Sequence, residues 1–157
     1  MASPLTLIMP LVPGTTFVEI STVIAEFSSS IGNALSTLQT VHYARVLLLD
    51  ASNPNLQPRL NSNGKFSMAI ITEYDGDFDA YIQDFVKAIG APFFDALLPM
   101  VVGGDAFVPI MDHIPAFQKY IAHNDASQHV PNSLGGNNGL YEAYPYTVPV
   151  ILASCGP

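Results

Sequence analysis

The chain has 157 residues, of which 49% are apolar and only 11% are charged, and its formal net charge is −8. This length accommodates one domain, residues 1–157, with a sizeable hydrophobic core. The five lysines and arginines are scattered, which argues against a nucleic-acid-binding surface, and no apolar run approaches the ~20 residues that a membrane span needs.

The acidic, charge-poor composition also bears on assembly and compartment. A soluble chain with so few charges is expected to hide part of its surface, so we predict a homodimer or a larger homo-oligomer. Cys155 is the single cysteine, which leaves no disulfide framework and no thiolate metal cluster. The N-terminal segment lacks the positive flank of a secretory signal. These features together predict a cytoplasmic protein.

The first predicted elements are a strand and a long helix. An apolar run over residues 5–12, ended by a Pro-Gly pair, predicts a buried strand. Apolar residues then recur at steps of three and four over 17–38, which predicts a helix with one apolar face. Thr16 followed by Glu19 is a capping-box pattern for its start, and the serines at 28–30 predict a break.

Two strands and further helices are predicted next. The runs 41–51 and 65–74 are rich in β-branched and aliphatic residues and are joined by a loop of prolines and asparagines. From Phe78 the pattern becomes helical until Gly90 ends it. Shorter helices are predicted in "PFFDALLPMVVGG" and "IPAFQKYIAHN".

The final segment completes the predicted topology. Residues 140–152 are strand-like but contain Pro145 and Pro149, which restricts any pairing to short or edge positions. The order βαββαβ predicts an α+β, ferredoxin-like fold, with a four-stranded antiparallel sheet and helices on one face. We expect the open, apolar face of that sheet to pair with the sheet of a second subunit.

The segment "ITEYDGDFDAYIQDF" places four aspartates within ten positions. A calcium-binding EF-hand loop that began at Asp75 would need glycine and glutamate where this chain has Ala80 and Val86. A helix start explains the residues better, because Asp77 can cap the helix and Asp79 lies favourably in its first turn. We therefore predict no metal site here.

Polar residues inside apolar strands are the candidates for chemistry. In "VHYARVLLLD", Arg45 shares a strand face with Tyr43, and His42 lies on the other face. A mid-strand arginine needs a partner or a wet cavity, and Glu73 in the following strand is the candidate partner. Either a structural Arg45–Glu73 ion pair or a catalytic pair is consistent with this pattern. His42 is a candidate general base, haem ligand or backbone-bonded core histidine.

Four blocks of the sequence resemble a known superfamily. The blocks "LTLIMPLVPG", "VHYARVLLLD", "EYDGDFDAYIQDF" and "LYEAYPYTVPVI" are similar to a pattern in bacterial proteins that resemble the dimeric α/β-barrel superfamily. In that superfamily two ferredoxin-like subunits close their sheets into a barrel. Its members include dye-decolorising peroxidases, chlorite dismutase-like haem proteins, antibiotic-biosynthesis monooxygenases, and cyclases and isomerases without cofactors. Where the bacterial pattern has Asn or Ser, this chain has Glu73.

The resemblance suggests a site in a barrel cavity. His42, Arg45 and Glu73 are the candidate catalytic residues, and His123, on a predicted helix, is a second candidate ligand for haem. Aromatic residues that could line a substrate pocket are Tyr43, Tyr74 and Tyr144.

Three functions remain open from the sequence. The first, which the resemblance of the sequence blocks favours, is a small-molecule oxidoreductase of the peroxidase or monooxygenase kind, with haem as a candidate cofactor. The second is a cofactor-free cyclase or isomerase, in which His42 or Glu73 abstracts a proton next to a carbonyl group and Arg45 stabilises the enolate. The third is a protein without catalytic activity that binds a ligand or builds an oligomer.

Overall fold

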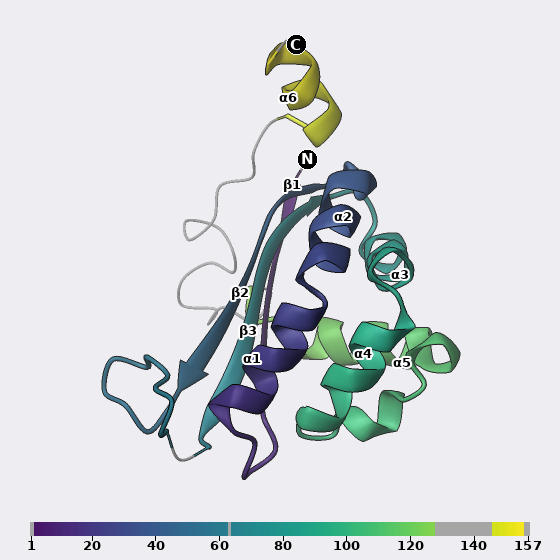
Figure 1. The fold of residues 1–157 in the computed structure, drawn as a ribbon. Coiled ribbons are helices and arrows are strands. Elements are labelled where there is room, and N and C mark those ends of the chain that lie inside the picture. Colours follow the sequence, from purple (N-terminus) through teal and green to yellow (C-terminus); the bar gives the residue numbers. More distant parts are fainter. Residues whose placement is uncertain (1, 63, 128–145, 156–157) are drawn as a thin grey trace, which may run out of the picture.

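Three antiparallel strands form the sheet in the computed structural model, which describes residues 2–62, 64–127 and 146–155 (Figure 1). β3 is the central strand and pairs with both of the others, in the order β1-β3-β2. The second and third strands match the predicted ones to within one residue, whereas the first begins three residues and ends two residues earlier than predicted. The strands are β1 (Ala2–Pro10), β2 (Val41–Asp50) and β3 (Phe66–Asp75).

Helices make up most of the other regular structure. The cap predicted at Thr16 is confirmed: Glu19 N–H donates to Thr16 Oγ1 at 3.2 Å, and Thr16 N–H donates to Glu19 Oε2 at 2.7 Å. The predicted long helix breaks at Phe27. No helix within the described ranges is long and apolar enough to cross a membrane. The α-helices are α1 (Phe17–Glu26), α2 (Ser28–Leu38), α3 (Phe78–Ile89), α4 (Ala91–Leu97), α5 (Ile110–Asn124) and α6 (Val148–Cys155), with 3₁₀ helices η1 (Leu98–Met100) and η2 (Gly104–Phe107).

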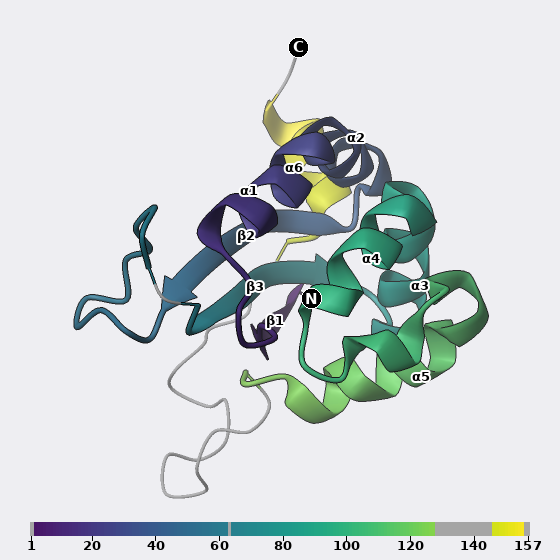
Figure 2. The same ribbon diagram turned by 60° about the horizontal axis from the view of Figure 1, so that its bottom comes forward.

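The helices α1 to α5 lie on one face of the sheet, and the core fills the space between (Figures 1 and 2). In the second view α1 and α2 follow β2, whereas α5 lies towards β1. Strand alternation and the observed register send Met68 and Ile70 to this side and send Ile8 and Tyr43 to the opposite side. The strand residues buried on the helix side include Leu5, Leu7, Met9, Phe66, Met68 and Thr72.

The prediction of a four-stranded ferredoxin-like sheet that forms a dimeric barrel is wrong. The described residues form a three-stranded, open sheet, and the expected fourth strand over 140–152 becomes the helix α6 from Val148 onwards. Residues 140–145 lie outside the described ranges. Pro149 is the second residue of α6, where a proline has no helical hydrogen bond to lose. A short apolar run such as "VPVIL" has no period that separates a strand from a helix, and the strand was the wrong choice.

The segment after α5 bonds to the outer edge of β1. Asp125 is 3% exposed, and its Oδ1 accepts a hydrogen bond from Thr6 N–H at 2.9 Å. The next residue, Ala126, donates its N–H to Thr6 O at 2.8 Å. The buried carboxylate and the backbone N–H of Ala126 therefore satisfy the N–H and C=O groups of Thr6 at the outer edge of the sheet.

Candidate functional site

The aspartate-rich segment forms the corner between β3 and α3. Gly76 turns the chain with a φ of +96°, a conformation that costs glycine little. Asp77 then caps α3, because its Oδ1 accepts from Ala80 N–H at 3.0 Å, and Asp79 lies in the first turn. The prediction of a helix start is therefore confirmed. The prediction that the segment binds no calcium stays a prediction.

Asp75 has a different role, which connects three parts of the chain. Its Oδ2 accepts a hydrogen bond at 2.8 Å from the N–H of Val148, the first residue of α6. Its Oδ1 lies 3.2 Å from Nε2 of His42. A carboxylate is favourable at a helix N-terminus because of the unbonded N–H groups there. Asp75 thus connects a histidine on β2 to the start of the C-terminal helix.

An irregularity in the sheet places His42 beside Asp75. Val41 is opposite Tyr74, but Tyr43 is opposite Glu73, so β2 has one extra residue at this point. That residue is His42. A bulge of this kind changes the direction of a side chain and is often found beside functional sites.

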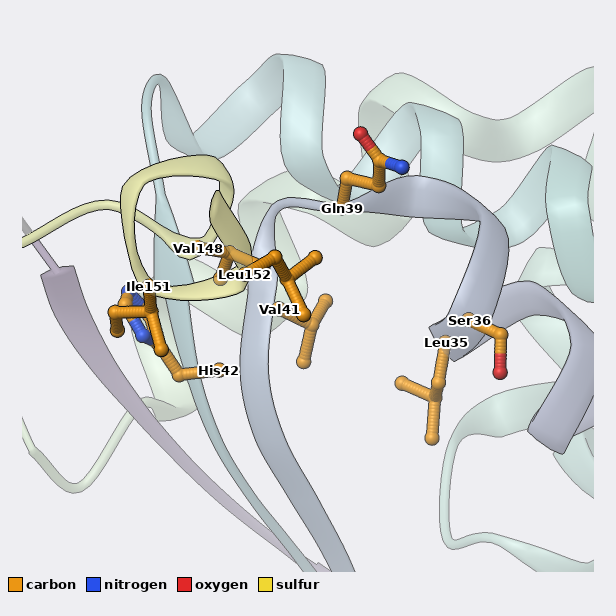
Figure 3. Close-up of a pocket in the computed structure, with 8 residues that line it drawn as sticks. All are labelled: Leu35, Ser36, Gln39, Val41, His42, Val148, Ile151 and Leu152. Atoms are coloured by element: carbon orange, nitrogen blue, oxygen red, sulfur yellow. The ribbon is translucent and has the colours of Figure 1, made fainter. Parts of the chain in front are cut away.

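A cavity of about 390 Å³ lies around the start of β2. Figure 3 shows α6 over the strand, with His42 and Leu35 on opposite sides of it. The described lining contains five aliphatic side chains, two neutral polar ones and the imidazole, and it contains no Lys or Arg. Such a lining suits a mainly apolar, uncharged molecule that makes a few polar contacts. The lining residues are Leu35, Ser36, Gln39, Val41, His42, Val148, Ile151 and Leu152.

The predicted partners Arg45 and Glu73 are separate from this cavity and from each other. Both lie on the sheet face that α1 to α5 leave uncovered, with Arg45 opposite Ile71 and Glu73 opposite Tyr43. Arg45 is exposed, Glu73 is half-buried, and these two described residues form no ion pair with each other. The buried ion pair expected from the sequence is therefore not formed within one subunit.

The predicted pocket tyrosines occupy unlike environments. Tyr43 is exposed on the uncovered sheet face, and Tyr74 is buried and stacks on Tyr81 with ring centroids 4.3 Å apart. Burial raises the pKa of Tyr74. Burial also raises the pKa of Tyr81 to about 12, although its hydroxyl shares a hydrogen bond with that of Thr72 at 3.1 Å. Neither Tyr43 nor Tyr74 lines the cavity beside His42, and Tyr144 lies outside the described residues.

His123 does not contribute to the cavity either. It is exposed in the last turn of α5, where a cationic side chain would be favourable, and it is not among the lining residues of the His42 cavity. The surroundings described for His123 are those of a surface residue and do not fit a buried haem pocket. We therefore derive no step through haem.

Sequence reasoning missed the residues that complete the site. From the sequence, Asp75 was considered only as a turn residue and as the first position of a calcium-binding loop. Asp77 alone caps α3, and Asp75 binds Val148 instead. The α6 residues Val148, Ile151 and Leu152 were missed because their segment was predicted as a strand. Comparisons of the chain with protein-family models, curated proteins and solved structures found no match. Function is therefore argued from the site itself.

Proposed function

We propose that the protein is a proton-transfer enzyme of the isomerase or cyclase type, with His42 as the base. The observation that supports this most is the position of Asp75, 3.2 Å from Nε2 of His42 at the edge of an apolar cavity. A carboxylate held in this way orients an imidazole and stabilises the imidazolium that forms when it accepts a proton. Of the functions left open by the sequence, this arrangement favours acid–base chemistry over an oxidoreductase.

The proposed step is the removal of a proton from the carbon next to a carbonyl group. His42 accepts the proton, and the electrons of the broken C–H bond form the enolate. A neutral substrate is favoured, because Asp75 lies beside the base and the chain as a whole carries a net charge of −8.

Deuterium exchange tests this step directly. A methyl ketone such as hexanone is incubated with the protein in heavy water, and deuterium at the carbon next to the carbonyl is followed by NMR. We expect exchange faster than in buffer, loss of that acceleration in His42→Gln, and a reduced acceleration in Asp75→Asn. A folded His42→Gln variant that exchanges the ketone as fast as the wild type would disprove the proposal.

We also propose that the protein forms a homodimer through the sheet face that α1 to α5 leave uncovered. Ile8 and Tyr43 are 45% and 44% exposed there, which is high for apolar and aromatic residues of a central sheet. Arg45 and Glu73 lie on the same face without pairing with each other. In a two-fold dimer the same patch meets its own copy, so Arg45 of each subunit can pair with Glu73 of the other.

A charge reversal tests this assembly by sedimentation. Arg45→Glu should dissociate the dimer, because two acidic side chains would then meet across the interface. The double variant Arg45→Glu with Glu73→Arg should restore it. A monomeric wild type, or a dimer that Arg45→Glu leaves intact, would refute the interface.

A further inference from the structure

A second cavity lies between the sheet and the helices, and every side chain that lines it is apolar. Its volume is about 40 Å³. Since one water needs roughly 10–15 Å³ of such space, this cavity has room for roughly three groups of that size. Without polar partners a water would be unfavourable there, whereas methylene groups would be favourable.

The linings of the two cavities include neighbouring residues of α2 and β2. On α2, Ile31 lines the apolar cavity and Leu35, one helical turn further on, lines the cavity of His42. On β2, Ala44 lines the first and Val41 the second. Val41 is paired with Tyr74, and Ala44 with Thr72, both on the helix side of the sheet. The two cavities are therefore neighbours along α2 and β2.

The helices above this space bury fewer side chains completely than α3 does. In α1 and α2 only Ile20 and Ala34 are buried, although both helices have an apolar face. Val46 faces the same helices and remains 39% exposed. The two helices are separated by a break at Phe27, and no side chain caps the start of α2. Two fully buried side chains hold this helix pair, against four in α3.

We propose that the ligand of the His42 cavity carries an unbranched aliphatic chain that extends beneath α2 into the apolar cavity. The proposal rests on the proposed function, since it names the substrate class of the same site: a neutral carbonyl compound with an alkyl tail. The carbonyl group lies near His42, and the end of the tail lies between Ile31 and Ala44. Each buried methylene group should raise the affinity about fourfold.

A series of methyl ketones from butanone to decanone tests the tail. Dissociation constants are measured by NMR titration on the full chain, for the wild type and for Ala44→Leu, which fills the apolar cavity. The matched control is Ala88→Leu, which adds the same atoms at an exposed position of α3. Ile31→Phe, at a half-buried position on α2, fills the cavity from the other wall if Ala44→Leu does not fold.

We expect affinity in the wild type and in Ala88→Leu to rise about fourfold with each methylene group and then to level off. In Ala44→Leu the rise should stop about three groups earlier, so that the longest ketones bind roughly 60-fold more weakly than to the wild type. Short ketones should bind both proteins equally.

Two outcomes would overturn the tail proposal. The first is an affinity that does not depend on chain length. The second is a rise that Ala44→Leu and Ile31→Phe leave unchanged, which would place the tail elsewhere, for example on the exposed side of α6. These titrations are repeated in His42→Gln. A chain-length dependence that persists in His42→Gln shows that the tail is bound independently of the base. In the wild type, the same dependence without any deuterium exchange above that in buffer would support the tail and refute the catalytic proposal.

Discussion

Two aspartates of the same short segment accept hydrogen bonds from the first turns of α3 and α6, but these two hydrogen bonds differ in sequence range. Asp77 caps α3 from three residues before Ala80. Asp75 binds the first N–H of α6 from a position 73 residues earlier in the chain. The first contact follows from local sequence alone, whereas the second exists only once β3 and the C-terminal segment have come together.

The two helices also differ in what they bury. α3 has a clear apolar face, and Tyr81, Ile82, Val86 and Ile89 are buried. None of the α6 residues 148–154 is buried, and Leu152 is 56% exposed. Hydrophobic burial therefore stabilises α3, and the contact with Asp75 contributes a larger share of what holds α6 in place.

The largest expected effect on stability comes from truncating one apolar side chain in α3, compared with the same truncation in α6. Ile82→Ala removes a side chain that is 2% exposed, so we expect the free energy of unfolding to fall by about 2–5 kcal/mol. Ile151→Ala makes the same change at a half-buried position of α6 and should cost less than about 1 kcal/mol. Denaturation in urea measures both. Equal losses in the two variants would show that α6 belongs to the cooperative core.

The same difference explains how much the sequence could predict. The caps at Thr16 and Asp77 and the face of α3 depend on residues within one or two turns of each other, and they were predicted correctly. The bulge at His42 and the binding of α6 by Asp75 depend on strand register and on residues far apart in sequence. No spacing rule reports such contacts. The α6 segment is a short apolar run with prolines, and its residues show no periodicity that distinguishes a helix from the strand that was predicted.

Alkaline pH offers a second test of how tightly α3 is packed. The pKa of Tyr81 is about 12 in the folded protein, because burial disfavours the tyrosinate, against 10.0 for an ordinary tyrosine. The folded state therefore keeps a proton that the unfolded state releases. The contribution of Tyr81 to the free energy of unfolding is fully present below about pH 10. It is lost as the pH rises towards about 12, and the loss is at most about 2–3 kcal/mol.

Urea denaturation at a series of alkaline pH values measures this effect. Tyr81→Phe is the control, since it cannot ionise and should reduce the loss of stability between pH 10 and 12. Tyr74, whose pKa burial also raises, accounts for part of the remaining slope. An unchanged slope in Tyr81→Phe would mean that Tyr81 ionises normally and is less buried than its packing against Tyr74 indicates.

The cap of α3 should have a smaller effect. Asp77→Ala removes the acceptor for Ala80 N–H, and we expect a loss of about 1 kcal/mol in the free energy of unfolding. Asp84→Ala, on the exposed side of the same helix, is the matched control and should change stability by less than about 0.5 kcal/mol. Similar losses in the two variants would argue against a specific cap and for a general effect of charge.

The smallest effect on global stability is expected at Asp75, together with the largest local one. Asp75→Ala removes the acceptor for Val148 N–H, so the amide protons of α6 should exchange with solvent faster, while those of α3 keep their protection. Asp77→Ala should give the reverse pattern. Asp75→Asn keeps an oxygen acceptor without the charge, and its exchange rates should fall between those of the wild type and Asp75→Ala. Unchanged exchange in α6 of the Asp75→Ala variant would mean that other contacts of α6, and not the carboxylate, hold the helix beside the His42 cavity.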